Sequence, residues 1–238
     1  MEPRLVEVRQ SAFKQNDLVA RSLRQRFHEA GVFVVSLVSS PGSGKTTFLE
    51  KTLTLLQPGC RVAALVGDLA TENDAARLAR SQAPVKQITT GTLCHLEAAM
   101  VQKALEDWDL GQLDFLFIEN VGNLVCPSSY DLGENLRLVL ISVTEGEDKP
   151  LKYPTIFNTS DVAVISKADL AEAAEFDASV ANHNIQCVRP GMEVVSVSAK
   201  TGQGMSTWLR FLLSQNPLCN QHQEDAKRDA AVTNPVAG

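Results

Sequence analysis

The feature that most constrains this chain is a glycine-rich run, Ser39–Thr46, with the sequence SSPGSGKT. A continuous apolar segment over 32–38 precedes it, and a helical pattern over 45–56 follows it. This strand–loop–helix order is the context that the phosphate-loop motif G-x-x-x-x-G-K-[ST] requires, and it disfavours the alternative of an incidental glycine-rich turn. Glycines let backbone N–H groups face phosphate oxygens, and the helix N-terminus adds a partial positive charge. The run therefore predicts a site for a nucleoside triphosphate with magnesium.

Within this run, Lys45 supplies a charge for the β- and γ-phosphates, and Thr46 offers its hydroxyl to magnesium. Ser39 replaces the first glycine of the motif, which puts the first bend of the loop in question but not the phosphate cradle. The residues predicted to bind the phosphates are Pro41, Gly42, Ser43, Gly44, Lys45, Thr46 and Thr47.

Apolar strand-like segments alternate with helical patterns along the chain, which predicts an α/β fold with a mostly parallel sheet flanked by helices. Strands are expected over 32–38, 61–67, 85–89, 113–119, 136–143, 161–166 and 193–197. Helices are expected over 13–30, 45–56, 71–80, 93–105, 171–182 and 204–214. The domain prediction is a helical extension over 1–30, a nucleotide-binding domain over 31–214 and a disordered tail over 215–238.

The charge balance is 22 basic against 28 acidic residues, which argues against nucleic-acid binding because phosphate contacts need surplus Lys and Arg. No apolar run approaches the ~20 residues of a membrane span, and no secretory signal is recognised, so we expect a cytoplasmic protein without a membrane segment. Five cysteines, an odd number without close pairing, argue against a disulfide framework.

Two later segments bear on which base is bound. Ser166–Asp169 resembles the N-K-x-D element of GTPases, in which Asp169 would accept both guanine donors and the Lys167 stem would pack on the base. Ser166 replaces the asparagine that usually braces this loop, so guanine affinity is expected to be reduced. A second element resembles the S-A-K segment, whose backbone N–H reaches the guanine oxygen, and it consists of Ser198, Ala199 and Lys200. Either segment alone also fits an ordinary turn, but the two in order after a phosphate loop predict guanine.

A second kind of chemistry is suggested by the adjacent Cys94 and His95 and by Cys126 on a later loop. Thiolate and imidazole suit nickel or zinc better than magnesium. Three ligands leave the coordination shell short, so a second subunit related by a twofold axis is expected to complete it. The alternative is a packed thiol beside a surface imidazole. The remaining cysteines have no His or Cys neighbour in the sequence and are interpreted as structural: Cys60, Cys187 and Cys219.

Hydrolysis needs magnesium, a positioned water and charge stabilisation. Asp68 and Glu119 each end a strand, where a carboxylate can reach magnesium together with Thr46. Gly122 is placed to donate its N–H to the γ-phosphate, and Asp74 is the candidate for orienting the water, although a surface helix charge explains Asp74 equally well. The catalytic set is therefore Lys45, Asp74 and Gly122, with nucleotide-ordered segments over 67–74 and 119–126.

Five segments together resemble the hydrogenase maturation GTPase HypB, of the SIMIBI class of P-loop GTPases, over about residues 10–215: Ser39–Thr46, Gly67–Asp74, Cys94–His95, Glu119–Cys126 and Glu145–Pro154. The resemblance implies a GTPase that assists nickel insertion into [NiFe]-hydrogenase, with GTP or GDP, Mg²⁺, and Ni²⁺ or Zn²⁺ as cofactors. It also implies a nucleotide- and metal-dependent homodimer, a nickel-delivery partner protein and the hydrogenase large subunit as partners. Many members carry an N-terminal cysteine motif or a histidine-rich run. This chain has neither, so nickel storage is not expected.

The sequence also leaves other functions open. A urease accessory G protein would carry a Cys-Pro-His run, whereas Cys126 is followed by Pro127 and Ser128. A chaperone GTPase for a cobalamin-dependent mutase would lack the Cys–His set, and a small-molecule kinase would leave Asp169 without a purpose. A zinc-bridged scaffold that binds nucleotide with negligible turnover is the non-enzymatic alternative.

Overall fold

The structure, a computed structural model, describes residues 4–68, 73–216 and Cys219. Its seven strands form one sheet in the order β3-β2-β4-β1-β5-β6-β7, and every neighbouring pair is parallel. The predicted α/β fold is confirmed. The strands are β1 (Phe33–Ser39), β2 (Val62–Asp68), β3 (Val85–Thr89), β4 (Phe115–Glu119), β5 (Leu136–Ser142), β6 (Val162–Ser166) and β7 (Glu193–Ser196).

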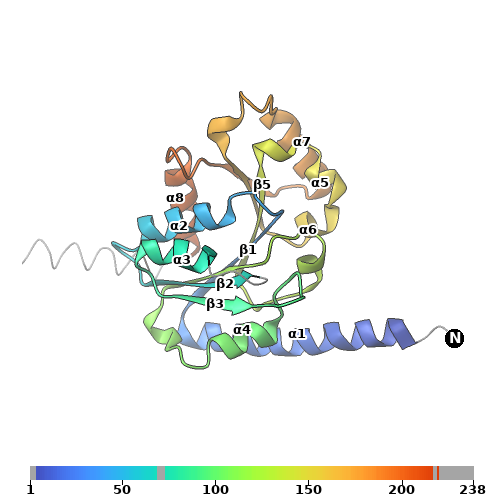
Figure 1. Cartoon of the computed structure of the whole chain (residues 1–238), viewed down its shortest axis with the longest axis vertical. Helices are drawn as coiled ribbons and strands as arrows, with labels where there is room; N and C mark the ends of the chain where they lie inside the picture. Colours follow the sequence, from blue (N-terminus) through green and yellow to red (C-terminus); the bar gives the residue numbers. More distant parts are fainter. Residues whose placement is uncertain (1–3, 69–72, 217–218, 220–238) are drawn as a thin grey trace, which may run out of the picture.

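Helices cover both faces of this sheet (Figure 1). They are α1 (Arg4–Ala30), α2 (Lys45–Leu56), α3 (Asn73–Leu78), α4 (Ala98–Ala104), α5 (Lys149–Lys152), α6 (Pro154–Asn158), α7 (Ala178–Val188) and α8 (Met205–Gln215). Residues of β1 pack alternately to the two faces, because successive strand side chains point in opposite directions. Val35 and Leu37 enter the core under α2 and α8. Val34 packs with α1 and α4, and Val38 packs with α6 and α7.

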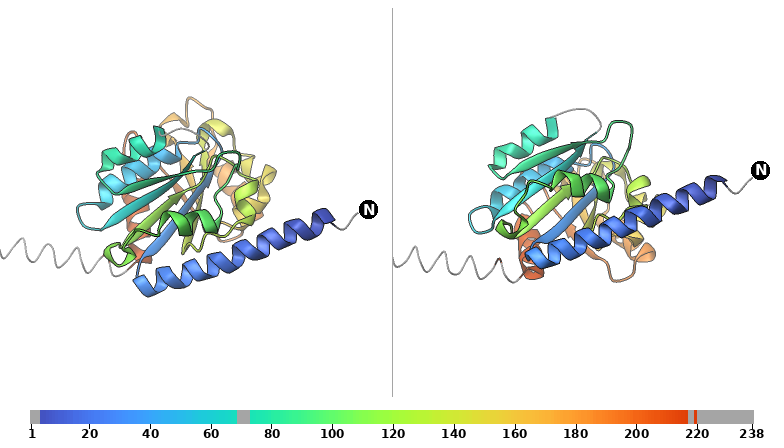
Figure 2. Two further views of the ribbon diagram at one scale, coloured as in Figure 1. Left: turned by 60° about the horizontal axis from the view of Figure 1, so that its bottom comes forward. Right: turned by 90° about the horizontal axis from the view of Figure 1, so that it is seen from below.

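The long helix α1, which lies within the predicted N-terminal helical extension, packs against the rest of the domain. Ala20, Leu23 and Phe27 are buried in the core that α1 shares with α4. A Cβ on Gly133 would lie 2.8 Å from the carbonyl oxygen of Ala20, so the 130–134 loop packs directly on the helix backbone. Figure 2 shows α1 running beside α4, with its N-terminal end projecting past the body of the domain.

Several predicted boundaries are wrong. The helix predicted over 171–182 begins only at Ala178, because the Asp177 side chain caps it by accepting from the N–H of Ser179 at 2.8 Å. The helix predicted over 93–105 begins at Ala98, and Glu97 before it is extended. The helices α5 and α6 were not predicted, and each has a proline in its first turn, where proline is tolerated.

The cysteine prediction also needs correction. Cys60 and Cys219 form a disulfide with 5.8 Å between their Cα atoms, although the odd number of cysteines without close pairing gave no sign of it. The predicted disordered tail lies outside the described residues except for Gln215, Asn216 and Cys219. Asn216 is buried, and its side-chain amide donates to the Asp114 carbonyl at 2.9 Å.

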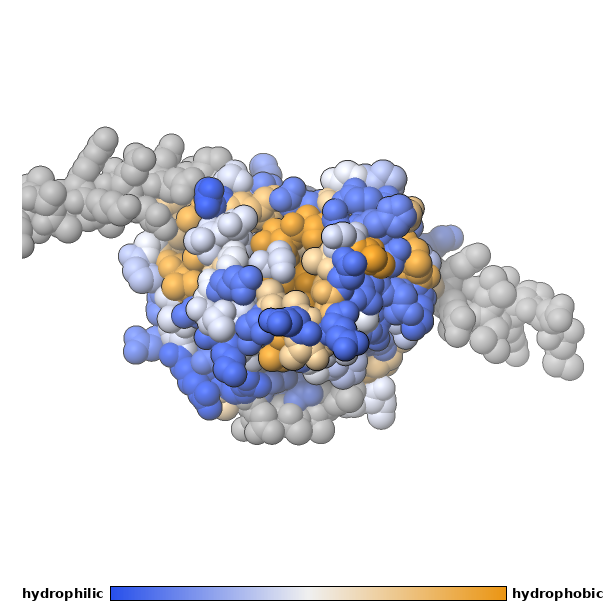
Figure 3. Space-filling model, turned by 90° about the horizontal axis from the view of Figure 1, so that it is seen from above, coloured by the Kyte–Doolittle hydropathy of each residue, from blue (hydrophilic) through white to orange (hydrophobic). Residues whose placement is uncertain are grey.

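The outer surface is mixed in polarity. Seen from above, hydrophobic side chains gather near the middle of the face, and hydrophilic ones border them (Figure 3). Among the described residues, none of the helices combines the length and apolar character needed to cross a bilayer.

Candidate nucleotide and metal sites

The phosphate loop connects the C-terminal end of β1 to the first turn of α2. β1 lies between β4 and β5, so the strands that follow β1 in the chain are found on both sides of it in the sheet. Ligands of such folds usually bind at the carboxyl end of the strand where the order changes direction. Gly42 and Gly44 have φ angles of 76° and 92°, which side-chain-bearing residues rarely adopt. Lys45 and Thr46 follow at the helix N-terminus and are buried. The sequence therefore builds an anion-binding cradle from backbone N–H groups.

Ser39 replaces the first glycine of the phosphate-loop motif, and Ser166 replaces the asparagine of the guanine motif. Both serines form hydrogen bonds with residues of the phosphate loop. The Ser43 hydroxyl donates to Oγ of Ser39 at 2.5 Å, so the position without glycine is tied to the middle of the loop. The Ser166 hydroxyl donates to the Ser43 carbonyl at 2.6 Å. Lys167 Nζ donates to the Gly42 carbonyl at 2.8 Å. Ser166 therefore bonds to the loop itself, and the reduction in guanine affinity expected from the missing asparagine stays a prediction.

A cleft of about 480 Å³ opens beside the loop. Several predicted residues from distant segments line it: Pro41, Gly42, Gly44, Lys45, Thr46, Thr47, Asp68, Asp74, Gly122 and Lys167. Ser43 is buried behind the cleft rather than lining it. Arg77, which the sequence analysis missed, also lines the cleft, and its guanidinium donates to the Thr47 hydroxyl at 2.8 Å. A third positive charge beside Lys45 and Lys167 suits a triphosphate.

The predicted magnesium ligands Thr46 and Glu119 are in direct contact. The Thr46 hydroxyl donates to Oε1 of Glu119 at 2.7 Å, while Oε2 of Glu119 is buried and bonds to nothing in the described part of the chain. Burial raises the pKa of Glu119 to about 7, and the Lys45 ammonium opposes the rise. Oε2 of Glu119 is thus a buried carboxylate oxygen next to a hydroxyl, and Asp68 lines the same cleft. These oxygen atoms fit a hard cation such as Mg²⁺. A side chain on Gly122 would lie 3.0 Å from Cα of Pro41, so only glycine fits there without a shift.

A second pocket of about 220 Å³ adjoins the cleft through Gly44 and Thr47. It collects all the residues predicted to hold the base: Lys167, Asp169, Ser198, Ala199 and Lys200. Phe48, Leu170 and Val197 add apolar walls that motif matching did not indicate. An apolar slot with one carboxylate and several backbone groups suits a planar purine that carries N–H donors.

The Cys/His cluster forms where two loops meet. Cys94 and His95 lie between β3 and α4, and Cys126 begins a 3₁₀ turn, Cys126–Ser129. The sulfurs of Cys94 and Cys126 are 3.0 Å apart, and one ligand atom from each of the three residues lies within 4.8 Å of the others. This is the only such group of three or more His, Cys, Asp or Glu among the described residues.

The electrostatics of the cluster suit a soft metal. The neighbouring Cys94 thiol and partial burial raise the pKa of Cys126, so a bound cation would be needed to favour the thiolate. Burial lowers the pKa of His95, against the effect of Glu97, and this favours the neutral imidazole that binds metals. His95 Nδ1 faces the Cys94 sulfur at 4.0 Å, and its Nε2 lies 3.6 Å from Glu97. A carboxylate behind the distal ring nitrogen is the usual partner of a metal-bound histidine.

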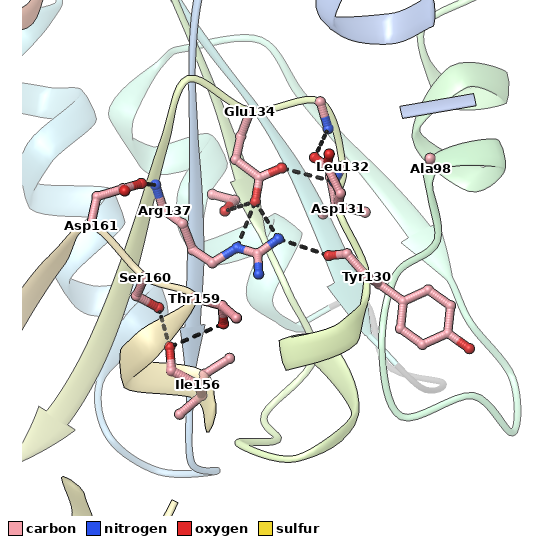
Figure 4. Close-up of polar contacts among 12 residues, drawn as sticks. Ala98, Tyr130, Asp131, Leu132, Glu134, Arg137, Ile156, Thr159, Ser160 and Asp161 are labelled. Atoms are coloured by element: carbon pink, nitrogen blue, oxygen red, sulfur yellow. Dashed lines mark hydrogen bonds and ion pairs between the residues drawn. The ribbon is translucent and has the colours of Figure 1, made fainter. Parts of the chain in front are cut away.

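Residues that no sequence motif indicated support this cluster. The Tyr130 ring stacks on His95 with 4.0 Å between centroids, and Phe13 of α1 packs against Tyr130. Arg137 donates to the Tyr130 carbonyl at 2.8 Å and pairs with the buried Glu134, which also accepts the N–H of Leu132 at 2.8 Å (Figure 4). A buried ion pair therefore fixes the loop that carries Tyr130.

Cys187, the free cysteine outside the metal cluster, also has a histidine nearby. Cys187 Sγ lies 3.4 Å from Nε2 of His183, one turn earlier on α7. The interpretation that Cys187 has no histidine near it is therefore wrong, because helical spacing of four residues brings the two side chains together.

Comparisons with known proteins identify the family of this chain. The model of the family "CobW/HypB/UreG, nucleotide-binding domain" matches residues 33–196. The hydrogenase maturation factor HypB of Azotobacter chroococcum mcd 1 is 43% identical over 97% of this chain and 75% of its own length. The hydrogenase/urease maturation factor HypB of Helicobacter pylori (strain ATCC 700392 / 26695) is 41% identical over 88% of each chain. The crystal structure of Helicobacter pylori HypB in complex with nickel superposes with a TM-score of 0.80 at 42% identity, covering 88% of this chain and 97% of that one. The chain therefore belongs to the HypB maturation factors of the CobW/HypB/UreG nucleotide-binding family.

Proposed function

We propose that this protein is a GTP-hydrolysing metallochaperone that assists nickel insertion into [NiFe]-hydrogenase. The observation that carries the proposal is the position of the two sites on one short segment. Glu119 contacts the phosphate-loop Thr46, Gly122 lines the phosphate cleft, and Cys126 belongs to the metal cluster. Nickel is the cargo, and hydrolysis is the event that changes how tightly it is held.

For hydrolysis, Lys45 and the backbone of the phosphate loop bind and orient the phosphates. Thr46, Glu119 and Asp68 would hold Mg²⁺, which supplies charge neutralisation at the β- and γ-phosphates when bound. Gly122 lies in the cleft where its N–H can meet the γ-phosphate, and Asp74 lines the same cleft, where it can orient a water. Asp169 accepts the guanine donors in the adjoining pocket.

For the metal, Cys94, His95 and Cys126 provide three ligands and leave one tetrahedral position open. We infer that a second copy of the chain completes the site, in a cytoplasmic homodimer that depends on nucleotide state and metal. Zinc can occupy the same thiolate and imidazole ligands as nickel. The partners are then a nickel-delivery protein and the hydrogenase large subunit.

The test combines turnover with metal stoichiometry. Steady-state phosphate release from GTP with Mg²⁺ should fall by about 1,000-fold or more in Lys45→Ala, because the substitution removes the positive charge that stabilises the transferred phosphate. Nickel binding by the Cys/His cluster should survive in that variant. Wild-type protein without GTP-dependent phosphate release would instead support the nucleotide-binding scaffold with negligible turnover.

A second acceptor is favoured by one comparison. The Helicobacter pylori relative is named a hydrogenase/urease maturation factor, and it matches 88% of this chain. Delivery of nickel to urease is therefore the second candidate function. Loss of hydrogenase activity alone, or of both enzymes, in cells without this protein separates the two.

A further inference from the structure

Two buried asparagines hold the segment that carries Cys94 and His95. The N–H of Leu96 donates to Oδ1 of Asn120 at 3.0 Å, and the N–H of Ala98 donates to Oδ1 of Asn16 at 2.9 Å. The two asparagines are 2% and 7% exposed, respectively. These bonds begin one residue after His95, so they set the path of the backbone on which this ligand sits.

The first asparagine belongs to the nucleotide side of the molecule. Asn120 follows Glu119 at the end of β4, and its N–H donates to the Leu37 carbonyl of β1 at 2.9 Å. Its Oδ1 accepts a second bond, from the N–H of Val121 at 2.9 Å. Val121 lines the phosphate cleft beside Gly122. One side-chain oxygen is therefore shared between the wall of the cleft and the backbone next to His95.

The second asparagine has no such connection. Asn16 lies on α1, does not line the cleft, and its amide donates to the Asp131 carbonyl at 2.9 Å. It therefore joins the loop after Cys126 to the backbone at Ala98, which links the two halves of the metal cluster to each other. Asn16 and Asn120 form a natural matched pair, with the same side chain, similar burial and adjacent targets.

The short stretch of chain between Gly122 and Cys126 connects the cleft to one ligand of the metal cluster, Cys126. Between Gly122 and Cys126 the chain turns, and Oδ1 of Asn123 closes this turn by accepting from the N–H groups of Val125 at 2.7 Å and Cys126 at 3.2 Å. This stretch of chain leads to Cys126, whereas Cys94 and His95 belong to the loop between β3 and α4. Hydrogen bonds weaken steeply when their angle opens, so a rotation of the 120–122 backbone alters the bond to Leu96 as well.

We propose that Asn120 is the positioning residue that transmits the nucleotide state to Cys94 and His95, so that both halves of the metal cluster respond together. The proposal rests on the proposed function, because it assumes nucleotide in the cleft and nickel on the cluster. Asn16 supports the same cluster without taking part in the coupling.

The experiment measures the dissociation constant of Ni²⁺ in the GDP form and in the form with a non-hydrolysable GTP analogue, by competition with a chelator. In wild-type protein the two constants should differ by about fivefold or more, the usual lower range of coupling between sites. Asn120→Ala should bring the ratio to about 1. Asn16→Ala should weaken binding in both forms and keep the ratio, and Asn120→Asp, which keeps the acceptor oxygen, should also keep it.

The proposal would be overturned if Asn120→Ala kept the wild-type ratio of the two Ni²⁺ dissociation constants. It would also be overturned if Asn16→Ala lost this ratio to the same extent as Asn120→Ala. A second measurement needs neither variant nor metal. The Leu96 amide of metal-free wild-type protein should exchange hydrogen at different rates in the two nucleotide forms, and equal rates would also overturn it. Wild-type protein that binds no nickel or releases no phosphate from GTP would contradict the proposed function instead.

Discussion

The nucleotide cleft and the Cys/His cluster lie at two ends of the same segment, yet they are built in different ways. The cleft is made largely by backbone: two glycines with positive φ, a helix N-terminus and a serine that bonds to a loop carbonyl. The cluster is made by side chains from two loops, which need support from α1, from Asn120 and from the Tyr130 loop. A backbone cradle exists before its ligand arrives, whereas a cluster held by side chains can be adjusted. This difference suits the proposed function, in which nucleotide is bound firmly and a metal is released.

The strongest way to break this contrast is to remove a metal ligand. Cys126→Ser should weaken nickel binding by more than about 100-fold, because losing even a supporting partner of a ligand costs 10- to 100-fold. Nucleotide binding in the absence of metal should stay unchanged, since Cys126 does not line the cleft. Chelator competition and fluorescent-GDP titration measure the two effects. Cys187→Ser is the control, and an equal loss there would place the nickel elsewhere.

The charge of the cleft is tested next, through Arg77. Arg77→Ala should slow GTP hydrolysis by about 10- to 100-fold, since one charged donor near the phosphates is lost. Arg80→Ala, an exposed arginine three residues on, should have no effect. Single-turnover phosphate release at saturating GTP separates slow chemistry from weak binding. Normal turnover in Arg77→Ala would mean that this guanidinium only supports Thr47.

The support of the cluster is tested through the aromatic ring on His95. Tyr130→Leu should weaken nickel binding by about tenfold, the lower range for loss of a residue that orients a ligand. Tyr130→Phe keeps the ring and should bind nickel as the wild type does. If both variants bind equally well, the cluster does not depend on its surroundings, and the contrast with the cleft disappears.

The smallest effect is expected at the brace of the phosphate loop. Ser166→Ala removes the hydrogen bond to the Ser43 carbonyl, which is worth about 0.5–1.5 kcal/mol, or about 2- to 10-fold in GDP affinity. Titration with a fluorescent GDP checks this, and Ser160→Ala serves as the control, because the Ser160 hydroxyl bonds to the Ile156 carbonyl of the preceding helix α6. Unchanged affinity would show that the cradle needs no brace from β6.

The same contrast explains what could be predicted from sequence. Lys45, Asp169 and Ser198 were recognised because each belongs to a short motif whose spacing is fixed by backbone geometry, and the structure places all three around one cleft and its adjoining pocket. Cys94 and Cys126 could be guessed from their chemistry, although they lie in different loops.

The supporting residues could not be recognised in this way. Asn16, Asn120 and Tyr130 matter through contacts between segments far apart in the chain, and no motif gives any of them this role, although Asn120 lies within the 119–126 segment. The disulfide between Cys60 and Cys219 was missed for the same reason, because it joins residues 159 positions apart. The start of α4 was placed too early because Leu96 and Ala98 donate to side chains instead of to helix carbonyls.

In the proposed function, nucleotide state controls the metal site, and a nickel titration of the wild-type protein checks this without any substitution. The GDP form and the form with a non-hydrolysable GTP analogue are titrated with Ni²⁺ while the oligomeric state is followed by light scattering. We predict nickel affinities that differ by about fivefold or more, with a change in the dimer fraction. Equal affinity together with an equal oligomeric state in both forms would contradict the account.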